Sequence, residues 1–193
     1  MDKKLATVLT VLALSLFALT ACEGNKTSWA YIHDPGTEIL SLSDNGKAEY
    51  KGSNYTYTKD DSFITLKGKD GSEKKMRYVP DDSNEDKMVL YESSVYQLEG
   101  EGSNDGVIGL WTQDNGWSFE FTEKGTFSEE KIFFGHYLVD EDAKTIKLMY
   151  DEPIEDAILY FNREGDELTI DYPWPMIKTG KDTGNESGSV TVK

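Results

Sequence analysis

Residues 117–127 read WSFEFTEKGTF, and no other segment indicates the class of the fold as clearly. Trp117, Phe119 and Phe121 alternate with polar residues, which is the period of two expected for a strand with one face in water. Gly125 follows where a tight hairpin needs a residue that accepts a positive φ. The segment therefore predicts a strand, a reversal and the start of a second strand.

Short apolar segments continue beyond this hairpin at intervals of about 8 to 12 residues. Turn-forming clusters at 140–142 and 162–166 separate several of them. The strands that we expect after Gly125 are Thr126–Glu129, His136–Val139, Thr145–Tyr150, Ala157–Phe161 and Glu167–Tyr172. No segment among them has a helical pattern. We therefore predict an all-β fold in which an antiparallel meander curls or closes.

The segment 29–91 is similar to the segment 111–172, at a separation of about 80 residues. Matching positions include Gly46 with Gly125, Tyr55 with Tyr137, Tyr78 with Tyr160, and 64–66 with 146–148. The economical interpretation is two repeated antiparallel units, each a meander or small barrel of about six strands. We expect the two units to pack side by side, and one merged barrel is the alternative.

This repeat sets the expected domain organisation, because the residues between the copies are acidic, rich in glycine and poor in apolar side chains. The expected segments are a signal peptide at 1–21, a tether at 22–28, a first β repeat at 29–98, a linker at 99–107, a second β repeat at 108–179 and a flexible tail at 180–193.

The N-terminus carries an export signal. Lys3 and Lys4 precede an apolar run of about 15 residues that extends from Leu5 to Leu19, which is typical of a secretory signal peptide and too short for a spanning helix. The run ends at Leu19, Thr20, Ala21 and Cys22, and Cys22 is the only cysteine of the chain.

These four residues resemble the lipobox of bacterial lipoproteins. The resemblance implies that the Cys22 thiol carries a diacylglyceryl group and becomes the first residue after cleavage. Two acyl chains anchor a protein stably where one is marginal. We therefore expect a protein that is lipid-anchored in the cell membrane and faces outside the cytoplasm. An ordinary secreted protein with a cysteine at the cleavage boundary by chance is the alternative.

Composition excludes several classes of function. The chain of 193 residues has 36 acidic and 20 basic residues and a formal net charge of −16, which repels nucleic acid and anionic lipid. With Cys22 assigned to the lipid, no thiol remains for a disulfide, a zinc site or a nucleophile. The fold therefore depends on its hydrophobic core.

The second repeat also resembles the lipocalin-like small β domains that are common in bacterial lipoproteins. The resemblance rests on Gly109-Leu110-Trp111, on Glu123-Lys124-Gly125-Thr126-Phe127, and on Tyr137-Leu138-Val139-Asp140 followed by Ile146-Lys147-Leu148. It covers nearly all of the second copy, whereas the first copy has Thr27-Ser28-Trp29 in place of the Gly-x-Trp motif. The resemblance implies a β-barrel scaffold and no assigned activity.

Aromatic side chains are the candidate ligand contacts. We expect Trp117, Phe133, Phe134 and Tyr160 to line the mouth of a barrel, or an exposed sheet face to bind a partner. Trp111 is expected in the core. Trp174 stands between two prolines, and we expect it to fold back as a plug, with an exposed contact as the alternative.

The sequence indicates no catalytic residue, metal site or cofactor. His33 and His136 have no second histidine at ligand spacing, and no serine lies in a nucleophile elbow. The acidic run 81–86 lacks the glycine and the terminal glutamate of an EF-hand loop. Adjacent like charges in a turn are more often simply solvated than metal-binding.

These observations favour a non-enzymatic binding or interaction module, lipid-anchored outside the cytoplasm. Its expected partners are the membrane, through the anchor, and an unknown small ligand or envelope protein, but no nucleic acid. One alternative is an extracytoplasmic hydrolase that uses paired carboxylates, which would need an acidic cleft with a carboxyl of raised pKa. Another is a protein inhibitor or assembly factor with a flat apolar face.

Overall fold

A computed structural model describes residues 25–100, 106–151 and 153–179, and every regular element in these ranges is a β-strand. The expected signal peptide, the Leu19 to Cys22 lipobox and the expected tail at 180–193 lie outside the described residues. So do residues 101–105 of the expected linker.

Seven strands precede this linker: β1 (Lys26–Tyr31), β2 (Leu40–Ser43), β3 (Lys47–Tyr50), β4 (Ser53–Lys59), β5 (Phe63–Lys67), β6 (Glu73–Pro80) and β7 (Lys87–Glu99). Seven follow it: β8 (Gly109–Thr112), β9 (Ser118–Phe121), β10 (Thr126–Glu129), β11 (Phe133–Asp140), β12 (Thr145–Tyr150), β13 (Ala157–Glu164) and β14 (Glu167–Thr179). The expected all-β class is confirmed.

The number of strands corrects the expectation of about six in each half. The additional strand in the second half is β8, which has only four residues. Its residues, Gly-Leu-Trp-Thr, do not alternate between apolar and polar, so the pattern by which a strand is recognised in sequence is absent.

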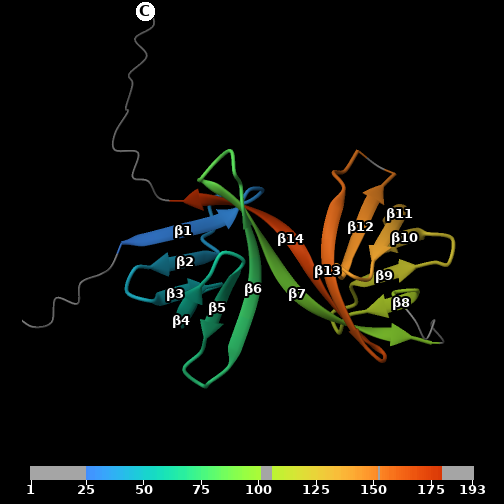
Figure 1. Ribbon diagram of the computed structural model, residues 1–193, viewed down its shortest axis with the longest axis horizontal. Coiled ribbons are helices and arrows are strands. Elements are labelled where there is room, and N and C mark those ends of the chain that lie inside the picture. Colours follow the sequence, from blue (N-terminus) through green and yellow to red (C-terminus); the bar gives the residue numbers. More distant parts are fainter. Residues whose placement is uncertain (1–24, 101–105, 152, 180–193) are drawn as a thin grey trace, which may run out of the picture.

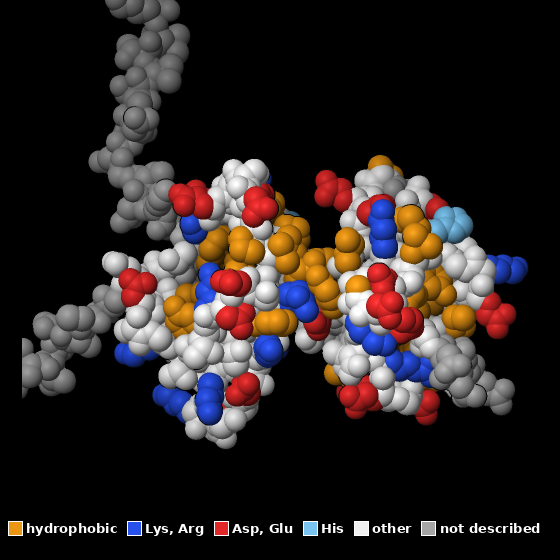
Figure 2. All heavy atoms as spheres, viewed as in Figure 1, with side chains coloured by type: hydrophobic (Ala, Val, Ile, Leu, Met, Phe, Trp, Pro, Cys, Tyr) orange, Lys and Arg blue, Asp and Glu red, His pale blue; other side chains and the backbone are white. Residues whose placement is uncertain are grey.

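All fourteen strands are antiparallel and form one closed ring, in which β1 closes against β14. One further pairing crosses this ring: β7 pairs with β14 from Lys87 opposite Ile177 to Gln97 opposite Glu167. We call this pair of strands the waist. Because the waist belongs to both halves, it divides the ring into two smaller closed rings of eight strands each. Figure 1 shows β7 and β14 passing between the two lobes, and Figure 2 shows in the same view the narrower middle that joins them.

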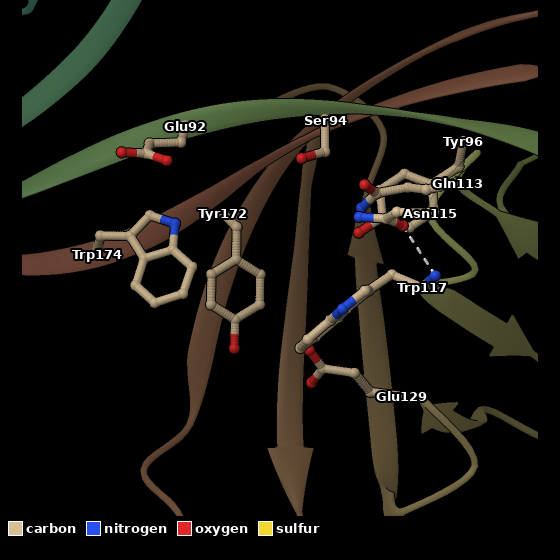
Figure 3. A pocket seen from close by; sticks show the side chains of 9 residues that line it. All are labelled: Glu92, Ser94, Tyr96, Gln113, Asn115, Trp117, Glu129, Tyr172 and Trp174. Atoms are coloured by element: carbon tan, nitrogen blue, oxygen red, sulfur yellow. Dashed lines mark hydrogen bonds between the residues drawn. The ribbon is translucent and has the colours of Figure 1, made fainter. Parts of the chain in front are cut away.

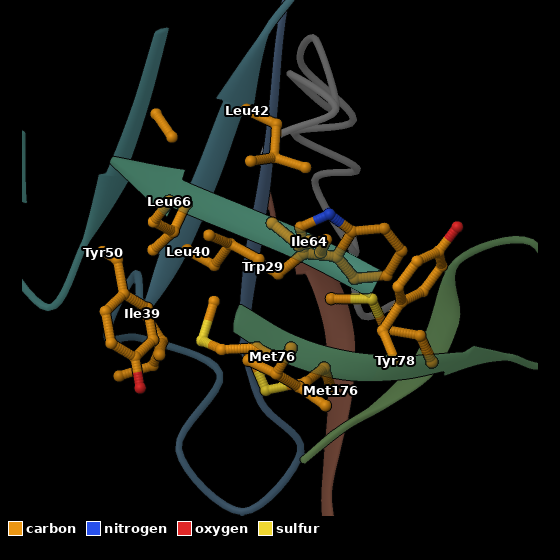
Figure 4. Close-up of a cluster of buried hydrophobic side chains, with 13 residues drawn as sticks. Trp29, Ile39, Leu40, Leu42, Tyr50, Ile64, Leu66, Met76, Tyr78 and Met176 are labelled. Atoms are coloured by element: carbon orange, nitrogen blue, oxygen red, sulfur yellow. The ribbon is translucent and has the colours of Figure 1, made fainter. Parts of the chain in front are cut away.

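We call the smaller ring that contains β1–β6 the N-terminal ring and the one that contains β8–β13 the C-terminal ring. Each encloses its own hydrophobic cluster. The cluster of the N-terminal ring, drawn in Figure 4, includes Leu40, Ile64, Leu66, Met76, Leu90 and Met176. The cluster of the C-terminal ring includes Trp111, Phe119, Phe121, Ile146, Leu148 and Leu168. Burial of these side chains is the main force that closes each ring.

β14 continues through Pro173 and Pro175, well beyond the expected end at Tyr172. The Pro175 carbonyl accepts a hydrogen bond from the Ile32 amide, 3.0 Å away, on the side of β14 that faces β1. In a strand, the N–H and C=O of one residue point to the same edge of the strand. The N–H groups that the two prolines lack would therefore have pointed away from β7, and no donor to β7 is lost. No strand of the ladder pairs with that edge at either proline, because β13 pairs only up to Asp171 and β1 begins to pair at Met176. The prolines therefore leave the waist intact.

The two glycine hairpins have the same backbone geometry. Gly46 has φ of 79° and Gly125 has φ of 74°, the left-handed region in which glycine is favoured. The Gly46 carbonyl accepts from the Tyr57 amide and the Gly125 carbonyl accepts from the Tyr137 amide, both at 2.9 Å. In these two hairpins Tyr57 makes the bond that Tyr137 makes, whereas the sequence match was between Tyr55 and Tyr137.

Candidate functional site

The even-numbered residues of the waist face one side, and those at its two ends belong to the two hydrophobic clusters. Each cluster covers only one end of this face. The middle carries Glu92 and Ser94 from β7 and Tyr172 and Trp174 from β14, and all four are half-buried. A polar and aromatic strip is therefore accessible between the two rings.

This strip forms one wall of a cavity of about 290 Å³, shown in Figure 3. The other walls come from the C-terminal ring: Tyr96 at the end of the waist, Gln113, Asn115 and Trp117 from the turn between β8 and β9, and Glu129 from β10. A pocket with aromatic walls and a few converging polar groups has the character of a small-molecule site.

The turn between β8 and β9 positions Trp117. The Gln113 amide donates to the Trp117 carbonyl at 2.8 Å, and the Trp117 amide donates to Asn115 Oδ1 at 3.0 Å. Gly116 has φ of 91°, which a residue with a side chain adopts only with strain. This compact turn holds Trp117 at the rim with 46% of its surface exposed.

Trp174 is held by aromatic contacts from both directions. The centroid of its ring lies 5.5 Å from that of Tyr172 and 5.2 Å from that of Tyr31. Tyr31 stacks in turn on His33, at 5.3 Å and 7°. Offset and tilted ring pairs of this kind are favourable beyond their burial alone. The indole of Trp174 is therefore fixed in the pocket wall and packs against the N-terminal cluster.

Both carboxylate oxygens of Glu92 have partners. Oε1 accepts a hydrogen bond from the Tyr31 hydroxyl at 2.6 Å, and Oε2 lies 2.6 Å from Lys51 Nζ. Burial, together with the bond to Glu92, raises the pKa of Tyr31, which stays protonated as a donor. The negative charge of Glu92 is thus balanced within the protein.

Glu129 has a different environment, because it is only 5% exposed and the hydrogen bond to its carboxylate comes from the Tyr150 hydroxyl, 2.7 Å from Oε2. Burial raises the pKa of Glu129, the bond from Tyr150 acts against this rise, and the charge of Glu130 adds to it. The Glu130 carboxylate accepts a hydrogen bond from the Ser118 amide. A carboxyl group with a perturbed pKa at a pocket wall marks a candidate functional residue.

Of the four aromatic residues expected to contact a ligand, only Trp117 lines this pocket. Phe133 and Phe134 lie on β11, where Phe133 is half-buried and Phe134 is 51% exposed. Tyr160 lies on β13 against Tyr91, whose odd-numbered position faces the other side of the waist.

Tyr160 joins the two rings on that other side. Its ring centroid is 5.1 Å from that of Tyr91 and 4.0 Å from the Arg77 guanidinium, which also lies 4.7 Å from the Phe63 centroid. Arg77 comes from the N-terminal ring and Tyr160 from the C-terminal ring. Contact between a cation and aromatic faces stabilises the two rings against each other.

Sequence reasoning placed Trp174 either as a plug or as a contact, and in the structure it both packs on a core and lines the pocket. It did not find Glu92 or Glu129. Glu129 lies two residues after the core residue Phe127 on β10, so the period of two places both side chains on the inner face. This local signal was present in the sequence but was not used.

A second cavity of about 440 Å³ lies at one end of the N-terminal ring and is lined by Trp29, Tyr57, Lys59 and Lys178 among others. Burial, with the charge of Lys178, lowers the pKa of Lys59. Acidic residues of the 81–86 loop also line this cavity, so it has no single charge character.

Across the described ranges, His, Cys, Asp and Glu form no group of three or more that could hold a metal ion. Nor do these ranges contain a helix with the length and hydropathy needed to cross a membrane. No family model matches the chain, and neither does any curated protein or solved structure.

Proposed function

We propose that this chain is a lipid-anchored, extracytoplasmic protein that binds a small ligand in the pocket at the waist and catalyses no reaction. The N-terminal sequence supports the anchor, because a positive start, an apolar run and Leu19-Thr20-Ala21-Cys22 occur in the order that a lipoprotein signal needs. Two acyl chains on Cys22 would keep the rings at the surface of the membrane.

One observation carries the binding function: the centres of both rings are filled by their own side chains, whereas the waist is open. Trp111, Phe119 and Phe121 are at most 1% exposed inside the C-terminal ring, and Leu40 and Leu66 are fully buried inside the N-terminal ring. Eight-stranded rings are just wide enough for side chains to fill. The cavity at the end of the N-terminal ring is lined by both lysines and acidic residues, and the aromatic pocket at the waist is therefore the better ligand site.

We further infer that the two rings are copies of one lipocalin-like unit. Equivalent hairpins at Gly46 and Gly125 support this, and so do left-handed residues at Lys51 and Glu130, each five residues beyond its hairpin glycine. The Lys51 amide donates to the Ile39 carbonyl at 2.8 Å and the Glu130 amide donates to the Ser118 carbonyl at 2.9 Å. Fusion of two such units through their last strands would create the waist, and with it a site that neither unit has alone.

A hydrolase that uses paired carboxylates is the second candidate, and the raised pKa of Glu129 is the observation in its favour. Glu92 is the other carboxylate of the pocket. Both of its oxygens are bound, by Tyr31 and Lys51, and this leaves it poorly suited to attack a sugar or to activate water. Binding without turnover fits this arrangement better.

Thermal unfolding of the full chain in the presence of a defined panel tests the binding function. The panel would contain cellobiose, maltose, choline, ethanolamine, glutamate and decanoate. We expect at least one compound to raise the melting temperature in a concentration-dependent way. Trp117→Ala and Trp174→Ala should each abolish that rise.

Phe134→Ala is the matched control, because Phe134 is an exposed aromatic residue of the same ring that lies outside the pocket. It should leave the ligand effect unchanged. A stabilising compound whose effect survives both tryptophan substitutions but is lost in Phe134→Ala would place the site on β11 and overturn the proposal. Steady release of product from cellobiose or maltose would favour the hydrolase.

The anchor has a separate test. Mass spectrometry of the native protein should find Cys22 at the N-terminus with a diacylglyceryl group, and Cys22→Ser should leave an unprocessed chain. A product that retains Met1 together with a free thiol would refute the anchor and leave the binding site untouched.

A further inference from the structure

Glu129 is a buried carboxylate at the wall of the pocket, and among the described residues no cation is paired with it. Its surroundings are Tyr150 on β12, Tyr172 on β14, Tyr96 on β7 and Glu130 in the following turn. Three of these are phenols and the fourth is a second acid. The charge of Glu92, at the other end of the same pocket, is balanced by Lys51.

The part of the pocket lining that the structure describes contains neither lysine nor arginine. A buried carboxylate is strongly destabilised unless a cation or several hydrogen bonds offset its desolvation. Glu129 has one such bond, from Tyr150. The environment of Glu129 therefore favours a positive charge that enters from the pocket.

The remaining walls suit the same charge, because aromatic faces attract cations. Figure 3 shows the Glu129 carboxylate beside the indole of Trp117, with Tyr172 and Trp174 continuing the row toward Glu92. Burial raises the pKa values of Tyr172 and Tyr96, and Tyr96 reaches about 12, so both remain neutral rings. A cation at Glu129 would thus contact a carboxylate and the rings of Trp117 and Tyr172.

We propose that the waist pocket binds an alkylammonium compound, with the ammonium group between Glu129 and the rings of Trp117 and Tyr172. This rests on the proposed function, because it names the class of ligand for the same site. The cavity of about 290 Å³ accommodates a small amine or quaternary ammonium ion. Gln113 and Asn115 would offer amide groups to a polar substituent of the ligand.

The test compares choline with 3,3-dimethylbutan-1-ol, which has the same shape without the charge. Calorimetric titration of the full chain should give an affinity for choline at least about 10-fold higher than for the neutral alcohol. Glu129→Gln keeps the shape of the side chain and removes the charge, so it should bring the two affinities close together. Glu120→Gln, an exposed position on β9, is the matched control and should change neither affinity.

Proton release on binding gives a readout that needs no substituted variant. A bound cation favours ionised Glu129, so the affinity of the wild-type chain for choline should rise with pH until Glu129 is fully ionised in the free protein. Titrations in buffers of different ionisation enthalpy should show proton release on binding at the acidic end of this range.

Three outcomes would overturn the inference: equal affinity for choline and its neutral isostere, choline affinity unchanged by Glu129→Gln, or affinity independent of pH while Glu129 titrates. None of these outcomes alone refutes the proposed binding function. Binding of a neutral sugar that depends on Trp117 and Trp174 would still support it. Loss of dependence on both tryptophans for every compound of the panel would refute the function itself.

Discussion

The interior of the C-terminal ring is built largely from aromatic side chains, whereas that of the N-terminal ring is mainly aliphatic and thioether. Six of the twelve buried residues in the C-terminal cluster are aromatic and none is methionine. Three of the thirteen in the N-terminal cluster are aromatic and three are methionine. Rigid rings define a single packing arrangement more sharply than flexible methionine side chains do.

The first tryptophan of each ring shows the same contrast. Trp111 on β8 is fully buried, and its Nε1 donates to the Val107 carbonyl at 2.7 Å. Trp29 on β1 lines the cavity at one end of its ring, with Lys178 Nζ 5.5 Å from the ring centroid. One ring is thus closed at this position and the other keeps a cavity there. The first tryptophan of each ring therefore differs in what lies beside it.

The largest expected effect separates these two tryptophans. Trp111→Ala should destabilise the protein by about 4 kcal/mol, because it removes a fully buried indole and leaves a cavity. Trp29→Ala should cost about 2 kcal/mol, since part of its surface already faces a cavity. Urea unfolding measured by circular dichroism checks both values. Equal costs would mean that the two rings are closed equally well.

Gly135 offers the next largest effect. A Cβ at this position would lie 2.1 Å from the Met149 carbonyl oxygen and 2.9 Å from a ring carbon of Phe127. Gly135→Ala should therefore cost about 3 kcal/mol through forced separation of β11 from β12. Gly46→Ala in the other ring meets no atom within 4 Å and should cost about 1 kcal/mol from its φ alone. A smaller cost for Gly135→Ala than for Gly46→Ala would contradict this packing.

The pH dependence of stability should have opposite signs in the two rings. Burial raises the pKa of Glu129. The stability that Glu129 contributes to the folded protein is therefore fully present below the ordinary glutamate pKa of about 4.3 and is lost as pH rises through the raised value. For Glu38, burial acts to raise the pKa, but bonds from Lys26 and Ser28 outweigh it and lower the pKa. The stability that Glu38 contributes is fully present above the ordinary pKa and is lost as pH falls through the lowered value.

The wild-type chain should lose stability as pH rises above the ordinary glutamate pKa, and Glu129→Gln should abolish this loss. The wild-type chain should also lose stability as pH falls below the ordinary pKa, and Glu38→Gln should abolish that loss. Urea midpoints measured from pH 3 to pH 8 check both. If Glu129→Gln changed the midpoint equally at every pH in this range, Glu129 would not titrate as its burial implies.

The smallest expected effects come from ion pairs. Lys51→Met should cost about 1 kcal/mol, because Glu92 is only 13% exposed and would lose its balancing charge. Lys147→Met in the C-terminal ring should cost less than about 0.5 kcal/mol, because both members of its pair with Asp156 are nearly half exposed. Thermal unfolding at low and high salt resolves the difference, and equal losses would remove the distinction between the two pairs.

The sequence predicted the local elements well because they depend on local chemistry. Thr126–Glu129 and Thr145–Tyr150 are strands with the expected bounds, and Gly46 and Gly125 form the expected reversals. The β7–β14 pairing could not be predicted, because alternation identifies a strand and not its partner. β14 also extends beyond its expected end at Tyr172, because Pro173 and Pro175 face an edge at which neither β13 nor β1 pairs with them.

The candidate site was harder to predict for the same reason. Trp117 was found as an aromatic residue near a hairpin, but Glu92, Glu129 and Trp174 come together only through the waist. Glu129 is one of 36 acidic residues. Its place two residues after Phe127 indicates the inner face of β10, but only the tertiary structure shows that it lines a pocket. Phe134 is the converse case, an aromatic residue on an exposed strand face away from the pocket.

The most direct test follows the four indole N–H signals of the chain by ¹⁵N NMR, each assigned by substitution to Phe, as choline is added. Trp117 and Trp174 report the waist, Trp111 the C-terminal core and Trp29 the cavity of the N-terminal ring. We expect the signals of Trp117 and Trp174 to shift with a common saturation curve while those of Trp29 and Trp111 stay in place. Saturable shifts of Trp29 or Trp111 with Trp117 and Trp174 unmoved would contradict a ligand site at the waist.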